Sequence, residues 1–358
     1  MDIPEYTVIL CDLSNQPILD ISKYINFNLN LKLNDVSTFS FDINTRILEQ
    51  LCLAIGTTPR QVLYPAKTEI KVYRNNILKF GGIISTVDTS YEENGATTSV
   101  SSDSYLQYFS KRLLNKTYTQ IDRSAIAWDA IATVQAVANG NLGVTQGTLA
   151  TIYDSDLTAD YQDVKSIIIN YTTYAPVKYD FEITPDKVFN TYTRLGSDKP
   201  EVELVYPQNI VSIKVPRSSD TLYNKIIGIG SGIGKERLES IKEDATSQLT
   251  YRVQETKQLY NSVSIQNTLD NNTQGYLDQS LGVLELPEIT INGSEIDLDT
   301  LAVGDSVTVR IDGSTMCDDV NGLYRIYTIN ISVDENAHET ITLSFYNPNS
   351  GGEIEQVE

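Results

Sequence analysis

Histidine, tryptophan and cysteine are scarce in this chain of 358 residues, which has one His, one Trp and three Cys. The lone histidine, His338, lies in the polar segment DENAHET, and Cys11, Cys52 and Cys317 stand far apart, without C-x-x-C or Cys/His spacing. Histidine is the commonest general base, and structural zinc needs clustered cysteine or histidine. The sequence therefore argues against a histidine-based catalytic triad, a zinc site and a disulfide framework.

Positive charge is also in short supply, with 27 Lys+Arg against 47 Asp+Glu and a formal net charge of -20. Such a surface repels phosphates, which argues against gripping nucleic acid by charge neutralisation. No run of about 18 apolar residues exists, and the start MDIPEYTVIL lacks the basic and apolar stretches of a signal peptide. We expect a soluble protein without a membrane anchor or a secretion signal of its own.

The glycine-rich segment YNKIIGIGSGIGKERL looks like a phosphate-binding loop but fails both glycine motifs. Relative to Gly234, a Walker A loop would need glycine at Ile229 and serine or threonine at Glu236. A dinucleotide fingerprint that starts from either of the first two glycines puts Ile233 or Lys235 at its sixth position, where glycine belongs. Acidic turns such as CDDVNG lack the calcium-loop spacing. We predict no catalytic, cofactor-binding or metal-binding residues, and favour a strand that ends in a loop.

Strand-forming residues dominate, with 22 Tyr and many Thr, Ile and Val. The stretch INFNLNLKLNDVSTFSFDIN, residues 25–44, alternates apolar and polar residues on both sides of one turn signal. This period of two predicts a β-hairpin with one buried face. The other face carries short polar groups and no catalytic grouping, so we predict an interface there. Its candidate residues are Asn28, Asn30, Lys32, Ser40 and Asp42.

The first unit, residues 1–105, reads as a small curled β domain with a helix in TRILEQLCLAIG that stops at Gly56. A second hairpin, IKVYRNNILKFGGII, turns at Asn75–Asn76, because asparagine tolerates the positive φ of tight turns. Gly81–Gly82 interrupts its return strand and predicts a bulge or a sharp bend.

The middle unit, residues 106–215, predicts an α+β insert of two helices against a small sheet. Its clearest helix, in DRSAIAWDAIATVQAVANG, opens with Ser124 as N-cap and closes at Asn139–Gly140. The second helical pattern is YQDVKSIIINYTTYA.

Residues 216–244 and 300–348 predict a second β domain, interrupted by a polar, projecting element at 245–299 and followed by a flexible tail at 349–358. The hairpin GLYRIYTINISVDENAHETITLSFYN provides its longest alternation. The fold class is therefore mainly β with α+β inserts.

The order of FSFDIN, IKVYRNNILKFGGII, SYLQYFSKRLL, YDFEITPDKVFNTY, YNKIIGIGSG, GDSVTVRI and the last hairpin resembles bacteriophage minor tail proteins. More narrowly, the chain resembles the Gp37-like tail proteins of the ReqiPepy6 type, which are related in fold to baseplate hub proteins. The similarity runs from about residue 5 to residue 347, and its order and spacing carry it.

This resemblance implies a structural tail hub in the virion, at the tail tip, assembled in the host cytoplasm. Two barrel-like tube domains per chain would let a homotrimer present six similar β units to a sixfold tail tube and a threefold tip. The implied partners are the tail tube protein, the distal tail protein, the tape measure protein and a tail spike or fibre. DNA would pass the lumen without specific binding, since an acidic wall does not hold phosphates.

Three alternatives stay open from the sequence. The first is the hub of a phage-like injection particle, which composition cannot separate from a phage tail. The second is a receptor-binding or carbohydrate-binding tail-tip protein, suggested by the tyrosines and the exposed Asn and Thr. The third is a wall-degrading enzyme, against which stands the lack of paired catalytic acids or a Cys/His set.

Overall fold

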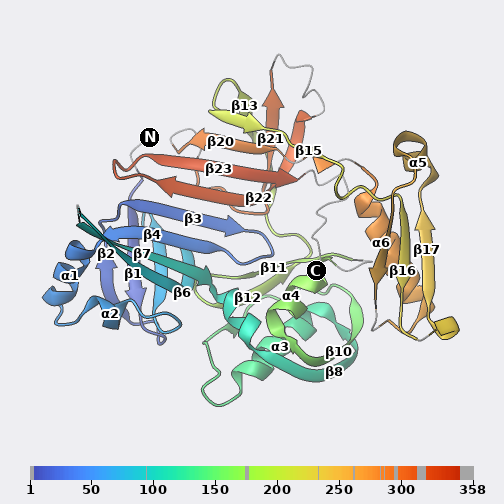
Figure 1. Cartoon of the computed structure of the whole chain (residues 1–358), viewed down its shortest axis with the longest axis horizontal. Coiled ribbons are helices and arrows are strands. Elements are labelled where there is room, and N and C mark those ends of the chain that lie inside the picture. The colour runs from blue at the N-terminus through green and yellow to red at the C-terminus, as the bar shows by residue number, and fades with distance from the viewer. Residues whose placement is uncertain are drawn as a thin grey trace.

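The structure is a computed structural model of the chain. It describes residues 4–93, 95–173, 177–232, 234–260, 263–282, 284–285, 287–293, 297–312 and 320–346. A 13-stranded sheet dominates these residues (Figure 1). Its path runs through β14 (Ser212–Lys214), β20 (Glu288–Asn292), β23 (Glu339–Tyr346), β22 (Gly322–Val333), β3 (Asn26–Lys32), β4 (Thr38–Asn44), β7 (Gly95–Ser104), β6 (Ile77–Glu92), β5 (Glu69–Arg74), β1 (Tyr6–Cys11) and β2 (Pro17–Ile21).

The centre of this sheet is an antiparallel pair made by strands from the two halves of the chain. β22 pairs with β3, from Phe27 opposite Val333 to Lys32 opposite Thr328. A branch leaves β22 through β21 (Ser306–Ile311) to β13 (Asp198–Tyr206). The described strands end in β14 and β2, so the sheet is open and no single-chain barrel closes within them. The amino-terminal and carboxy-terminal β units therefore share one sheet.

The predicted turns and first helix are confirmed. The hairpin at residues 25–44 is β3 and β4, and Asn34 in its turn has a φ of 57°. Asn75 and Asn76 both have positive φ, 48° and 63°, as a tight hairpin turn between β5 and β6 requires. The helix α1 (Thr45–Ala54) is followed by Gly56 at a φ of 73°. A short helix, α2 (Pro59–Val62), comes next.

The glycine pair Gly81–Gly82 does not form the bulge that was one of the two predicted outcomes. The register of β6 shifts on either side of it, once against β5 and once against β7. A Cβ on Gly81 would lie 2.6 Å from the carbonyl oxygen of Pro185, and one on Gly82 would lie 2.3 Å from that of Asp103. These glycines therefore allow neighbouring backbone to approach, which is the other use of glycine in strands.

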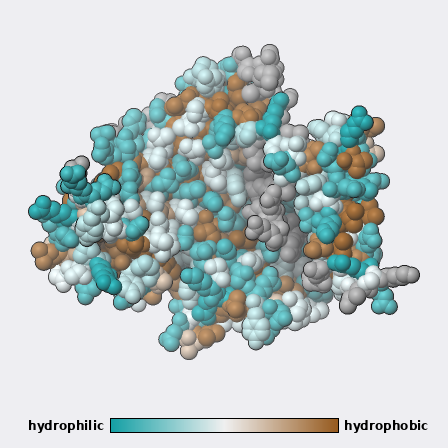
Figure 2. Space-filling view, viewed as in Figure 1, coloured by the Kyte–Doolittle hydropathy of each residue, from teal (hydrophilic) through white to brown (hydrophobic). Residues whose placement is uncertain are grey.

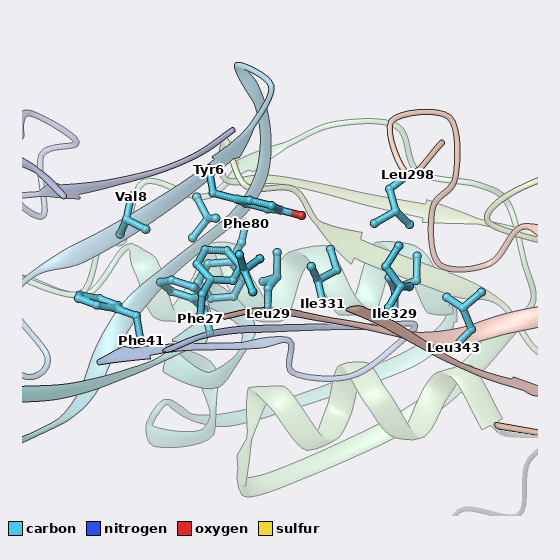
Figure 3. Packing of buried hydrophobic residues seen from close by; sticks show 14 of the residues in the cluster. Tyr6, Val8, Phe27, Leu29, Phe41, Phe80, Leu298, Ile329, Ile331 and Leu343 are labelled. Atoms are coloured by element: carbon cyan, nitrogen blue, oxygen red, sulfur yellow. The ribbon is translucent and has the colours of Figure 1, made fainter. Parts of the chain in front are cut away.

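A single apolar cluster covers one side of the sheet across both halves (Figure 3). Phe27 and Leu29 of β3 lie beside Ile329 and Ile331 of β22, and all four are at most 2% exposed. The ring of Phe27 lies 4.9 Å from that of Phe39, centroid to centroid. Burying one such side chain stabilises the fold by about 1.5–3 kcal/mol. The two β units therefore unfold as one body rather than as separate domains, because they share this cluster.

Residues 105–192 form an α+β unit with its own apolar core, which we call the insert. The insert elements are the 3-10 helix η1 (Tyr105–Lys111), β8 (Leu113–Asp122), α3 (Arg123–Gln135), β9 (Thr145–Gln146), β10 (Asp154–Asp163), α4 (Val164–Thr173), β11 (Asp180–Ile183) and β12 (Val188–Tyr192).

No helix among the described residues has both the length and the apolar character to span a bilayer.

The ends of helix α3 differ from the prediction. Its N-cap is Asp122, whose carboxylate accepts a hydrogen bond from the backbone N–H of Ser124 at 2.9 Å, so Ser124 itself lies inside the helix. Both residues are good caps, and the carboxylate also complements the helix dipole. The helix ends at Gln135, ahead of Asn139–Gly140, and Val137 is 57% exposed rather than part of the core.

Strand pairing also differs from the predicted partition of the chain. β13 and β14, within residues 106–215, pair into the large sheet. In contrast, β16 (Lys225–Ile229) is the central strand of a separate small sheet, where it pairs with β17 (Glu239–Glu243) on one side and with β18 (Glu255–Leu259) on the other. None of the three pairs with the described strands of residues 300–348. Helices α5 (Ala245–Tyr251) and α6 (Gln266–Ser280) complete this unit, which β15 (Arg217–Ser218) and β19 (Leu284–Glu285) connect to the rest. We call residues 224–282 the projecting unit (Figure 1).

A buried ion pair links the two halves of the large sheet. The Arg74 guanidinium on β5 donates from Nε and Nη2 to the Glu339 carboxylate on β23, at 3.0 and 3.1 Å. The Glu339 and Arg74 side chains are only 2% and 6% exposed. Tyr6 Oη also donates to Glu339, and the Arg74 guanidinium forms a second ion pair with Asp299 at 3.0 Å. Burial opposes ionisation of Asp299, but the hydrogen bonds from Asn75 and Arg74 outweigh it and lower the pKa of this carboxyl.

Two further buried ion pairs hold the insert against the sheet. Lys187, between β11 and β12, donates to Glu69 of β5 at 2.6 Å, and Tyr105 Oη donates to the same carboxylate at 3.1 Å. Arg325 of β22 pairs with Asp180 of β11. The insert is therefore tied to both halves of the sheet.

Replacing Arg74 with methionine should lower the free energy of unfolding by about 3–5 kcal/mol, because Glu339 would be left buried and uncompensated. Arg310→Met is the matched control, since its pair with Asp312 is nearly half exposed and should be worth about 1 kcal/mol or less. Denaturant unfolding measures both. A loss in Arg74→Met no larger than in the control would contradict the linking role of this pair.

Candidate assembly surface

The side of the large sheet opposite the apolar cluster carries an uninterrupted row of uncharged polar residues that crosses both halves of the chain. Residues directly opposite each other in antiparallel strands point to the same face. The register therefore aligns seven of them across β20, β23, β22, β3, β4, β7 and β6. They are Asn292, Thr340, Ser332, Asn28, Ser40, Ser101 and Thr86.

A second row lies next to the first, two residues further along each strand. It is formed by Ser212, Thr290, Thr342, Asn330, Asn30, Thr38 and Asp103. We call the two rows together with Lys32, Asp42 and Asp88 the polar face. Asp42 and Asp88 lie on it because both are opposite Ser99 of β7. The row of Lys32 continues through Thr328 and Ser344 to Glu288 and Lys214. With Glu288 and Lys214 included, the polar face has four acids and two bases among many Asn, Ser and Thr.

All five residues that the sequence proposed as an interface lie on the polar face. Asn28 is exposed, and the other four are half-buried. Asp42 accepts a hydrogen bond from Asn26 Nδ2 at 2.6 Å, and Lys32 pairs with Asp35 at 3.3 Å. Their role in an interface stays a prediction.

The sequence reasoning missed the half of the polar face that β22, β23 and β20 contribute. Asn330 and Ser332 are the direct neighbours of Asn30 and Asn28, but they lie 300 residues away along the chain. The alternation in YTINISV marks a strand with a polar side and was the available signal. It does not say which strand will be its neighbour, because pairing partners follow from the whole topology.

Two asparagine oxygens at the β3–β22 junction are buried without a hydrogen-bond donor. These are the Oδ1 atoms of Asn30 and Asn330, which face each other across the strand pair. Leaving a buried polar group unpaired costs about 1–3 kcal/mol. The chain thus keeps polar side chains on this face at a cost in stability.

The titratable groups of the described residues do not form a reactive or metal-binding cluster on this face. No group of three or more His, Cys, Asp or Glu side chains in the described ranges could hold a metal ion. Burial raises the pKa of the Cys11 and Cys52 thiols, which disfavours the reactive thiolate. The backbone N–H of His338 donates to Asp334 in the β22–β23 turn. Cys317 lies outside the described residues.

Replacing Asn30 and Asn330 together with valine should raise the free energy of unfolding by about 1–3 kcal/mol, because two unpaired oxygens would be removed from the interior of the face. Asn28→Val is the control, since Asn28 is exposed on the same strand and should change stability by about 0.5 kcal/mol or less. Thermal and denaturant unfolding report the difference. A destabilised double variant would show that these amides have partners that hold them.

No protein-family model matches the sequence, and a search of curated proteins gives no match. Solved structures do match. The 43 kDa tail protein of prophage MuSo2 from Shewanella oneidensis is 12% identical, with a TM-score of 0.69 over 96% of this chain and 99% of that one. A tail protein from Neisseria meningitidis is 12% identical, with a TM-score of 0.67 over 96% and 97%.

A third similar structure comes from a secretion machine. An Escherichia coli component of the type VI secretion system, described as similar to the T4 bacteriophage tail proteins gp27 and gp5, is 10% identical. Its TM-score is 0.53 over 95% of this chain and 77% of that one. At these identities the likeness concerns the fold. The chain therefore has the mainly β fold of phage tail and spike proteins.

Proposed function

We propose that this chain is a structural tail hub, which forms a ring of three at the distal end of a phage tail tube. The observation that carries the proposal is the polar face, which runs across both β units without a break. If several copies stand side by side in a ring, their polar faces would join into a continuous polar wall around a channel.

The joined β units supply the symmetry argument. Each chain contributes two neighbouring halves to one sheet, held by β3–β22 pairing and the Arg74–Glu339 ion pair. Three such chains would present six β units, which matches a sixfold tube above and a threefold tip below. Contacts between copies would also cover the open strands β2 and β14, which otherwise invite aggregation.

The composition of the polar face fits the passage of DNA without binding. Short Asn, Ser and Thr side chains offer no cationic grip on phosphates. The face has four acids, Asp42, Asp88, Asp103 and Glu288, against two bases, Lys32 and Lys214. With the net charge of -20, such a wall repels the backbone of DNA. The proposed neighbours are the tail tube protein, the distal tail protein, the tape measure protein and a spike or fibre. The proposed location is the virion tail tip, and the role is structural rather than enzymatic.

A second candidate is the hub of a phage-like injection particle, which the likeness to the type VI secretion component favours. In such a particle the lumen would not carry DNA. A receptor-binding or carbohydrate-binding role would instead predict a monomer that binds whole host cells. Release of soluble fragments from purified cell walls would revive the idea of an enzyme.

The purified chain should form a homotrimer and bind tail tube protein, because the open sheet edges and the polar face are complete only in a ring. Sedimentation measures the mass, and co-sedimentation with tube protein measures the binding. A monomer that binds host cells but not tube protein would contradict the hub proposal.

Particles that carry Asp42→Lys and Asp88→Lys should eject DNA more slowly than the parent, because two cations would face the phosphates in the lumen. Glu49→Lys in α1 is the control, an exposed site away from this face with the same change of charge per substitution. Time-resolved release of DNA to a dye reports the rate. Equal ejection kinetics in all three would count against the lumen assignment.

A further inference from the structure

One face of the small sheet in the projecting unit is apolar and open to solvent. A Cβ on Gly228 would meet Thr273 and one on Gly230 would approach Leu269, so these glycines of the β16 segment face α6. Neighbouring residues of a strand point to opposite sides, and those next to the glycines therefore point away from the helix. Register places four apolar residues on that outer side. They are Ile227, Ile229, Ile241 and Leu259, which we call the sheet patch.

The sheet patch is exposed and has an acidic border. Ile241 and Leu259 are 53% and 52% exposed, and apolar residues gather visibly on this unit (Figure 2). The same register puts Glu239, Glu243 and Glu255 on the outer side. Lys225 and Lys257 also lie there, and Lys225 is already paired with Glu255 at 3.0 Å. The surface is therefore apolar with a small negative excess at its rim.

A second exposed apolar surface occurs at the tip formed by α1 and α2. Leu53, Ile55 and Tyr64 are 77%, 49% and 51% exposed there, and we call them the tip patch. Residues 45–67 carry three basic side chains, Arg46, Arg60 and Lys67, against the single acid Glu49. The tip therefore has a local excess of positive charge, although the whole chain has a net charge of -20. This charge is opposite in sign to that at the rim of the sheet patch, so the two surfaces are electrostatically complementary.

The two patches lie at opposite ends of the long axis of the molecule (Figure 1). One chain cannot bring them together, whereas a neighbouring copy can. Head-to-tail contact between unlike patches closes into a ring when the rotation between copies allows it. We propose that the sheet patch of each chain binds the tip patch of the next copy. This inference rests on the proposed hub ring and names the surfaces that would join its subunits.

A charge swap tests the contact. Arg60→Glu and Glu243→Arg should each weaken self-association by about tenfold or more, because each places like charges across the contact. The two changes combined in one chain should restore most of the affinity. Lys111→Glu and Glu93→Arg are the controls, as exposed sites outside both patches. Sedimentation equilibrium measures the association. Equal association in all variants, or no rescue by the combination, would overturn the proposal.

Cross-linking supplies an independent readout. In a Cys317→Ser background, Leu53→Cys in one tagged chain and Leu259→Cys in another should form a disulfide-linked pair under mild oxidation, while Cys11 and Cys52 are buried. Two chains that both carry Leu53→Cys should not. A trimer without the mixed cross-link would overturn this contact and leave the hub proposal standing. A chain that neither self-associates nor binds tube protein would overturn both.

Discussion

The pairing of β3 with β22 is the constraint on which the rest of the structure depends. It joins the two ends of the chain in register from Phe27–Val333 to Lys32–Thr328. Through it, the apolar sides of both halves form one core and their polar sides form one face. The buried ion pair between Arg74 of β5 and Glu339 of β23 adds a second link between the two halves of the sheet. Without this pairing the two β units would each present a short polar strip and an open edge.

The polar face shows a balance between stability and use. A sheet could bury its junction more favourably with apolar residues than with Asn30 and Asn330, whose oxygens lack donors. Keeping polar groups along the whole width avoids an exposed apolar sheet, which would be prone to association. Acids outnumber bases on this face, as they do in the whole chain, so the proposed lumen would be negatively charged.

Local patterns predicted local structure well. The hairpin at 25–44, the Asn75–Asn76 turn and the helix after Asn44 follow from alternation, positive φ and helical spacing. The pairing between distant strands could not be predicted from the sequence, because each alternating strand can pair with many others. The strand expected at the Gly228 and Gly230 segment is β16, but its packing against α6 was not visible in the sequence. Half of the polar face was missed for the same reason.

Electron microscopy of the assembled particle, at a resolution that separates strands, tests the central claim most directly. The account predicts a threefold ring at the end of the tail tube, with Asn28, Ser40, Asn330 and Ser332 facing the channel. A ring in which these residues face outward, or a position of the chain away from the channel, would contradict it.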